Sequence, residues 1–234
     1  MKKYYRIAGL VTTMEPFADS EWISRPYQIE PQESIDFQID TEWRLLKEKY
    51  PNATDSACYL FVSGKSFYQN LIDYDGMMFH SSAVVMDGKA YLFSAEPGTG
   101  KSTHTSLWRR VFGDDKARIL NDDKPAIRYE NGVWYAYGTP WSGKTTQNLN
   151  LKVPIGGIAF IERGEKNEIV KYEGKDLVCR VLSQTNRPQT PDRTAKLLSH
   201  IDCLIEKVPF WKLRCNMEPE AAILSYQVMS GKEI

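Results

Sequence analysis

Three groups of residues between positions 80 and 123 have types and spacing suited to phosphoryl chemistry. They are His80, the stretch 95–103 (Ala-Glu-Pro-Gly-Thr-Gly-Lys-Ser-Thr) and the pair Asp122-Asp123. The stretch matches the phosphate-binding pattern G-x-x-x-x-G-K-[ST], except that Ala95 stands where the first glycine belongs. Together these groups offer backbone amides and a lysine for phosphates, and carboxylates for a metal ion or a proton.

The stretch 95–103 has the sequence context that a phosphate-binding loop requires. The apolar run 90–93 precedes it as a buried strand, and 102–112 reads as a helix that Gly113 stops. Because the free N–H groups at the start of such a helix face the phosphates, we expect Lys101 to reach the terminal phosphates and the Ser102 hydroxyl to bind Mg²⁺. An ordinary glycine-rich turn between a strand and a helix is the alternative. The residues expected to bind the nucleotide are Ala95, Pro97, Gly98, Thr99, Gly100, Lys101, Ser102 and Thr103.

The aspartate pair follows an apolar strand expected at 116–120. Nucleotide enzymes place a Mg²⁺ ligand at such a strand end, beside the phosphate loop. We expect one aspartate to hold the metal and the other to accept the proton of the acceptor hydroxyl, with the two roles left unassigned. An acidic turn that caps the strand is the alternative, as is a structural role for His80. The catalytic candidates are Asp122, Asp123, His80 and Lys101, and the metal-binding candidates are Ser102, Asp122 and Asp123.

The segment 138–145 (Gly-Thr-Pro-Trp-Ser-Gly-Lys-Thr) also satisfies the strict phosphate-loop pattern. It follows the second strand of a hairpin, and the polar residues 145–152 with Pro154 behind them do not predict an amphipathic helix. No helix N-terminus is then available to hold a phosphate. We expect a loop at the edge of the site that touches substrate or nucleotide. A Gly-Pro turn with an exposed lysine is the alternative.

Charge and composition exclude several classes of protein. The chain carries 30 basic and 30 acidic residues, so neither nucleic acid nor an anionic membrane is an expected partner. No stretch approaches the roughly 18 consecutive apolar residues of a transmembrane helix, and residues 1–5 do not lead into a signal-like apolar core. The 4 cysteines are scattered and are expected to be free thiols. These features predict a cytoplasmic globular protein.

The order of strand and helix patterns predicts an α/β fold with a mixed sheet and several hairpins. Residues 1–75 are expected to form a β-rich N-terminal region, with strands at 4–12 and 58–62 and a helix at 41–50. Residues 76–234 are expected to form the core that carries the phosphate loop, with C-terminal helices, and both parts to form one compact unit. Beyond the loop and its helix, the core is expected to contain two strands within 76–93, a hairpin at 126–137, strands at 155–161, 168–172 and 210–215, and helices at 174–184, 191–207 and 219–229.

Residues 75–130 resemble the HPr kinase/phosphorylase superfamily, whose catalytic core is shared with the ATP-dependent phosphoenolpyruvate carboxykinases. His80 ahead of the loop, the run 98–103 and the pair Asp122-Asp123 carry the resemblance, in this order along the chain. The resemblance implies a mixed-sheet P-loop core and an ATP- and Mg²⁺-dependent kinase that phosphorylates a serine hydroxyl of a peptide, a protein or a small molecule. It also implies an aspartate as general base, with His80 and Lys101 around the transferring phosphoryl group.

Other functions stay open at the level of the sequence. The C-terminal signature of the bifunctional enzymes has no counterpart in this chain, so phosphorylase activity and HPr as the acceptor are not expected. Carboxykinase activity is not expected either, because the further arginine and metal-ligand motifs are missing. A nucleotide-binding sensor without transfer activity is the main alternative, and an ATPase coupled to motion is a weaker one. The sequence does not determine the acceptor or whether the chain forms a homo-oligomer.

Overall fold

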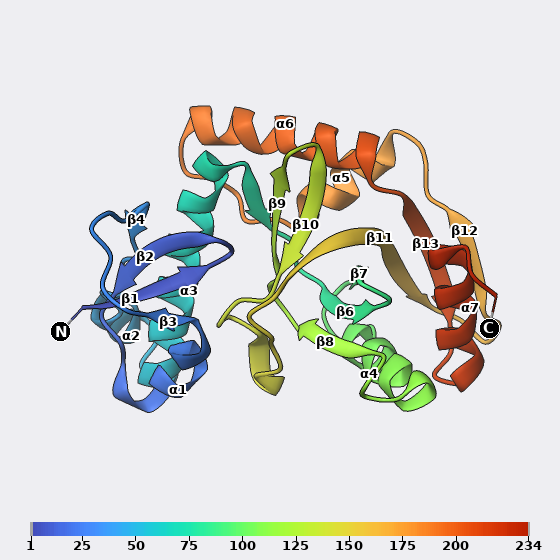
Figure 1. The fold of residues 1–234 in the computed structure, drawn as a ribbon, viewed down its shortest axis with the longest axis horizontal. Coiled ribbons are helices and arrows are strands. Elements are labelled where there is room, and N and C mark those ends of the chain that lie inside the picture. The colour runs from blue at the N-terminus through green and yellow to red at the C-terminus, as the bar shows by residue number, and fades with distance from the viewer. Residues whose placement is uncertain (1, 234) are drawn as a thin grey trace.

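Strand β11 (Lys152–Arg163) connects the two parts of a curled, nine-stranded mixed sheet in the computed structural model, which describes residues 2–233 (Figure 1). The first residues of β11 pair antiparallel with β10 (Val133–Tyr137). Its later residues lie parallel to both β7 (Lys89–Ser94) and β13 (Phe210–Cys215). The expected mixed sheet is therefore confirmed, and one long strand holds it together.

A glycine pair lets β11 pass from one part of the sheet to the other. The pairing of β11 with β7 shifts its register between Ile155 and Gly157. A Cβ atom on Gly157 would lie 2.2 Å from the ring of Trp211 on β13. Only a residue without a side chain permits this close approach, so Gly157 fixes where the strand curves.

The rest of the chain forms further strands and helices. The remaining strands are β1 (Lys3–Ile7), β2 (Leu10–Met14), β3 (Gln28–Ile29), β4 (Phe37–Gln38), β5 (Gly76–Met78), β6 (Ser82–Met86), β8 (Arg118–Asn121), β9 (Ala126–Glu130) and β12 (Glu168–Lys171). The α-helices are α1 (Glu21–Ser24), α2 (Arg44–Lys49), α3 (Asp55–Leu71), α4 (Lys101–Phe112), α5 (Asp176–Ser183), α6 (Pro191–Lys207) and α7 (Pro219–Ser230). Within residues 2–233, none of them has both the length and the apolar character that a membrane span requires.

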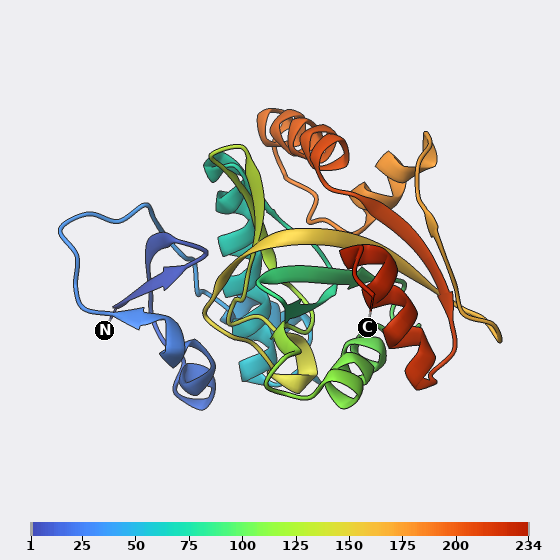
Figure 2. The ribbon, with the colours of Figure 1, turned by 45° about the vertical axis from the view of Figure 1, so that its right-hand side comes forward.

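Helices cover both faces of the central strands, as Figure 2 shows with α6 on one side and α4 and α7 on the other. Successive residues of a strand point to opposite faces, and β7 follows this rule. Ala90 and Leu92 pack in the core beneath α5 and α6, whereas Tyr91 and Phe93 pack against α4 and α7. Burial on both faces explains why this stretch of sequence is continuously apolar.

The N-terminal residues form a second, four-stranded sheet in the order β3-β1-β2-β4, which packs with α3. The core of this region includes Tyr5 and Ile7 from β1 and Phe67 and Leu71 from α3. It also includes Trp141, which belongs to the loop after β10. Residues from both sides of position 75 therefore share one core.

Two expectations for this region are wrong. The strand expected at 58–62 is part of α3, whose first turn is capped by the Thr54 side chain accepting a hydrogen bond from Ala57 N at 3.1 Å. A five-residue apolar run does not distinguish a buried helix from a strand, and the helical spacing emerges only over the whole of α3. The single strand expected at 4–12 is a hairpin, because Ala8 and Gly9 both have positive φ and form its turn. The two hairpins and the three C-terminal helices expected in the core are confirmed.

We expect Gly157→Ala to lower the free energy of unfolding by about 1–3 kcal/mol, because the added methyl group must displace Trp211 or the strand. Equilibrium urea denaturation measures the change. In a Trp211→Leu variant, which lacks the ring, Gly157→Ala should lower the free energy of unfolding by less than it does alone. An unchanged unfolding midpoint for Gly157→Ala would contradict this account of the bend.

Candidate active site

The pairing of β6 brings three groups to one edge of the sheet: His80, the stretch 95–103 and the pair Asp122-Asp123. Strand β6 is antiparallel to both β7 and β8, so β7 and β8 run in the same direction. The loop after β7 and the aspartates after β8 therefore leave the same edge of the sheet. His80, two residues before β6, lies at this edge too. The structure thus brings together residues that lie as far apart in the sequence as His80 and Asp123.

The glycine-rich loop (residues 95–100) leads from β7 into α4, as expected. Gly100 is the N-cap of α4, makes no side-chain capping bond, and its carbonyl accepts the backbone hydrogen bond of His104 N at 2.9 Å. The amides of residues 101–103 therefore precede the hydrogen-bonded ladder of the helix. Gly98 and Gly100 have positive φ, and a Cβ atom on either would meet no atom within 4 Å. The loop thus presents bare backbone at a helix N-terminus, which suits an anion.

Ala95 does not disturb this loop, although a glycine is usual at its position. The φ angle of Ala95 is not among the positive values in the described chain. Its methyl group is fully buried in the same core as Phe93 and Trp108. Because the backbone there is ordinary, an alanine fits and adds a core contact.

Lys101 lies across the glycine-rich loop. Its Nζ atom donates a hydrogen bond to the carbonyl oxygen of Ala95 at 2.9 Å, and 9% of the residue is exposed. Burial lowers the pKa of Lys101, while the nearby charges of Asp123, Glu96 and Asp122 act in the opposite direction. The result is a sheltered cation beside the free amides of α4.

Asp122 is buried, and both of its carboxylate oxygens accept hydrogen bonds from neutral hydroxyls. Ser82 Oγ donates to Oδ1 at 2.6 Å and Thr145 Oγ1 donates to Oδ2 at 2.7 Å. Ser82 Oγ also lies 2.7 Å from Thr105 Oγ1, which in turn donates to the carbonyl of Ser102 at 3.2 Å. A chain of hydrogen bonds thus joins Asp122 to the first turn of α4.

Asp123 has a different environment, with His80 and Lys124 as its partners. Its Oδ1 lies 3.2 Å from His80 Nε2, and its Oδ2 accepts a short bond from Lys124 Nζ. Burial by itself raises the pKa of Asp123, but the hydrogen bonds and charges of His80 and Lys124 outweigh burial and lower the pKa to about 2. Asp123 is therefore ionised throughout the physiological range, and its side chain is more accessible than that of Asp122.

The segment 138–145 is not a second phosphate cradle. Its lysine, Lys144, lies within a three-residue 3-10 helix, Gly143–Thr145, and no α-helix begins there. Instead the segment supports the aspartates. Thr145 binds Asp122, and a Cβ atom on Gly143 would lie 2.8 Å from that of Asp123. The segment therefore lies beside the two aspartates, at the edge of the candidate site.

Several residues of this site were not found from the sequence. Gln184 accepts hydrogen bonds from His80 N at 2.8 Å, through its backbone carbonyl, and from Ser94 Oγ at 3.1 Å, through its side chain. Arg163 donates to the carbonyls of Gly98 at 2.5 Å and Thr99 at 3.3 Å, so it holds the loop. The positioning residues missed are Ser82, Thr105, Lys124, Thr145, Arg163 and Gln184. The sequence pointed only to Ser82, which is close to His80, and to Thr145, which belongs to the second match to the phosphate-loop pattern.

His104 lines the cavity beside the loop but does not reach the aspartates. It is buried, its Nε2 lies 3.0 Å from Ser225 Oγ, and its ring packs edge-on against Phe93. Burial lowers the pKa of His104 to about 3, so the ring is neutral. His200 on α6 lies 3.0 Å from the carbonyl of Ile72, far along the chain from the loop. His80 is thus the histidine that the fold brings to the aspartates.

The oxygen donors at this edge suit a magnesium ion shared with phosphates. Within the described part of the chain, no three His, Cys, Asp or Glu side chains form a metal cluster. Mg²⁺ in nucleotide sites needs only one or two carboxylates, because phosphates and waters supply its other ligands. Ser102 at the start of α4 and the carboxylate of Asp122, linked to that turn by hydrogen bonds, provide such a set.

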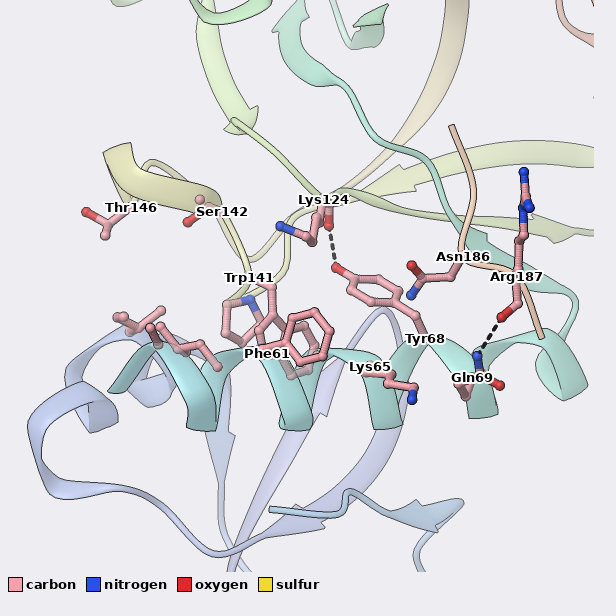
Figure 3. A pocket seen from close by; sticks show the side chains of 16 residues that line it. Phe61, Lys65, Tyr68, Gln69, Lys124, Trp141, Ser142, Thr146, Asn186 and Arg187 are labelled. Atoms are coloured by element: carbon pink, nitrogen blue, oxygen red, sulfur yellow. Dashed lines mark hydrogen bonds between the residues drawn. The ribbon is translucent and has the colours of Figure 1, made fainter. Parts of the chain in front are cut away.

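A cavity lies on each side of the loop. One of about 400 Å³ is bordered by the loop and by the ends of β11 and β13, with Leu107, Ile161 and Asn216 among its lining. The other, of about 450 Å³, lies on the side of the aspartates, between α3 and the loop after β10 (Figure 3). Lys124 and Gly143, both in contact with Asp123, line this second cavity.

No family model matches the chain, and no curated protein matches it. Among solved structures it is similar to the HPr(Ser) kinase/phosphatase from Coxiella burnetii, with 10% sequence identity and a TM-score of 0.39. That comparison covers 66% of this chain and 95% of the other. The similarity is a distant one of fold, and no residue role below rests on it.

The Asp123 environment predicts a loss of stability in acid. Its pKa is about 2 in the folded chain against an ordinary 3.8, so its stabilising contribution is complete above about pH 4. The contribution is lost as the pH falls from about 4 to about 2, because the unfolded chain takes up the proton first. Asp123→Asn should therefore make the thermal midpoint fall less steeply over this range.

Scanning calorimetry at a series of pH values tests this expectation. Asp202→Asn, on an exposed position of α6, controls for the loss of an aspartate elsewhere. Identical slopes for Asp123→Asn and the wild type below pH 4 would show that the contacts with His80 and Lys124 do not stabilise the folded chain.

Proposed function

We propose that this protein is an ATP- and Mg²⁺-dependent kinase that transfers the γ-phosphoryl group to a serine hydroxyl of a peptide, a protein or a small molecule. The observation that carries the proposal is the order of groups along one sheet edge. The cavity beside β11 and β13 comes first, then the loop with Lys101, then His80 and the aspartates, and then the second cavity. A nucleoside, its phosphates and an acceptor would lie in that order.

The glycine-rich loop is the proposed cradle for the phosphates. The amides of residues 101–103 begin α4, and the Lys101 ammonium bonds to the carbonyl of Ala95 at the start of the same loop; both favour negative charge. The nucleoside would occupy the cavity of about 400 Å³, whose lining includes apolar Leu107 and Ile161 and the polar side chain of Asn216. Because the proposed reaction consumes ATP, we propose that the protein works in the cytoplasm.

The two aspartates take different roles in this proposal. Asp122 is buried, bonded to neutral hydroxyls and connected to the turn that contains Ser102, so Asp122 and Ser102 would hold the metal. When bound, Mg²⁺ would neutralise charge on the phosphates. Asp123 is ionised and contacts Lys124, which lines the second cavity, so we assign Asp123 the role of accepting the acceptor's proton.

The transfer then needs only groups that the chain already positions. The acceptor oxygen bonds to the γ-phosphorus as the bond between that phosphorus and the β–γ bridging oxygen breaks, and the hydroxyl proton passes to Asp123. ADP leaves with the bridging oxygen. His80 holds the Asp123 carboxylate and Lys101 faces the developing charge, which is the positioning that phosphoryl transfer requires.

We expect Asp123→Asn to reduce phosphoryl transfer by about 10²- to 10⁴-fold, the usual contribution of a general base, while ATP still binds. Lys101→Ala should weaken ATP binding itself. The purified protein is incubated with γ-labelled ATP, Mg²⁺ and extract of its native cell. Label is then measured in protein, peptide, small-molecule and free-phosphate fractions.

Asp202→Asn is the matched control and should behave as the wild type. Label in free phosphate alone, in the presence of extract, would identify an ATPase and overturn the proposal. Bound ATP with no turnover would instead support a nucleotide-binding sensor. Full transfer by Asp123→Asn would remove Asp123 from the role of base.

A further inference from the structure

The cavity of about 450 Å³ beside Asp123 has a composition that the transfer chemistry alone does not explain. Its walls are α3 on one side and residues 140–146 on the other, with Asn186 and Arg187 at one end (Figure 3). Lys124 lines it and binds the Asp123 carboxylate, so the cavity opens next to the proposed base. A hydroxyl held at the end of this cavity formed by Lys124 and Gly143 would therefore lie next to Asp123.

The walls of this cavity are largely aromatic and apolar. Trp141 and Tyr68 are buried, and their polar atoms are already bonded, to Ser63 Oγ at 3.1 Å and to Thr139 Oγ1 at 2.9 Å. Their rings are left to contact a ligand through apolar surface. Gly64 makes room for this wall, because its Cβ atom would lie 3.0 Å from the Trp141 ring.

Phe61 stands at the rim of the same cavity with 60% of its surface exposed. Because the fold leaves this phenyl ring exposed beside a cavity, a ligand in the cavity can bury its apolar surface. Phe61 comes from α3, and Trp141, from the loop after β10, lines the same cavity (Figure 3). The rim and the inner wall therefore both favour an apolar group on the ligand.

The charges around the cavity have one sign. Lys65, Lys124 and Arg187 line it, and its lining contains no aspartate or glutamate. Lys124 is committed to Asp123, but within residues 2–233 neither the Lys65 ammonium nor the Arg187 guanidinium has a hydrogen bond or ion pair. The guanidinium points away from α3 in Figure 3, whereas Lys65 lies on α3 itself, one helical turn after Phe61. Unpaired cations beside an apolar wall suit a ligand with a carboxylate.

We infer that this cavity is the acceptor site and that it selects a small molecule in which a hydroxyl, a carboxylate and an apolar or aromatic group lie close together. The inference rests on the proposed kinase function for the fate of the hydroxyl. The volume falls within the range of about 300–1,000 Å³ that small-molecule sites occupy. Asp123 would face the hydroxyl, Lys65 the carboxylate, and Phe61 with Trp141 the apolar group.

N-benzoyl-L-serine carries all three groups and serves as the probe. N-benzoyl-L-serinamide lacks the charge and N-acetyl-L-serine lacks the ring. Isothermal titration of the full chain should show the probe binding about tenfold more tightly than either, since one charged hydrogen bond or one buried ring contributes about that much. Equal affinity for the acid and its amide would overturn the inference. Tighter binding of a serine peptide with both ends blocked would overturn it as well.

Two variants separate the charge from the ring. Lys65→Gln should reduce the preference for the acid over the amide from about tenfold to near one. Phe61→Ala should weaken the binding of both benzoyl compounds and leave the affinity for N-acetyl-L-serine unchanged. Lys166→Gln, an exposed lysine between β11 and β12, is the matched control and should keep the full preference. An unaltered preference in Lys65→Gln would remove this lysine from the site.

The same titrations distinguish this inference from the proposed function. Acid-selective binding that depends on Lys65, with no phosphorylated probe after incubation with ATP and Mg²⁺, would support the cavity and count against the kinase. Transfer of label to an acceptor in the extract, with no selectivity in the cavity, would support the kinase and overturn the acceptor class.

Discussion

Strand β6 pairs antiparallel with β7 on one side and with β8 on the other, and the whole candidate site depends on this pairing. Two strands that share an antiparallel neighbour must run in the same direction, so the loop after β7 and the aspartates after β8 emerge together. The pairing also returns His80 to that edge. A shift of register by one residue would turn Ser82 away from Asp122 and break the connection to α4.

The polar groups of the site are held by the interior of the fold. Ser82, Thr105 and Thr145 place their hydroxyls between Asp122 and α4, and a buried carboxylate without such donors would be costly. Helix α4 is itself anchored beneath β7 by Trp108, a fully buried ring that contacts Phe93 and Tyr226. The apolar core therefore fixes the helix N-terminus to which the carboxylate is tied.

The two aspartates illustrate how neighbours in sequence acquire different chemistry. Asp122 points into the protein toward hydroxyl groups, whereas Asp123 points toward His80 and Lys124. These partners lower the pKa of Asp123 and keep it ionised, and its side chain is 22% exposed. Burial and partners, and not residue type, divide the metal-binding role from the role of base in our proposal.

Local sequence determined the elements whose signals are short-range. The apolar run, the glycines and the lysine at 90–103 specify a strand, a loop and a helix start, because each signal acts within one or two turns of chain. The hairpin at 126–137 has a similarly local origin in Asn131-Gly132, where both residues have positive φ. Tertiary structure alone decided the rest. It placed Thr145 so that its hydroxyl holds Asp122. It also built the cavity of about 450 Å³ from α3 and the loop after β10, since contacts between distant segments depend on packing that no local pattern encodes.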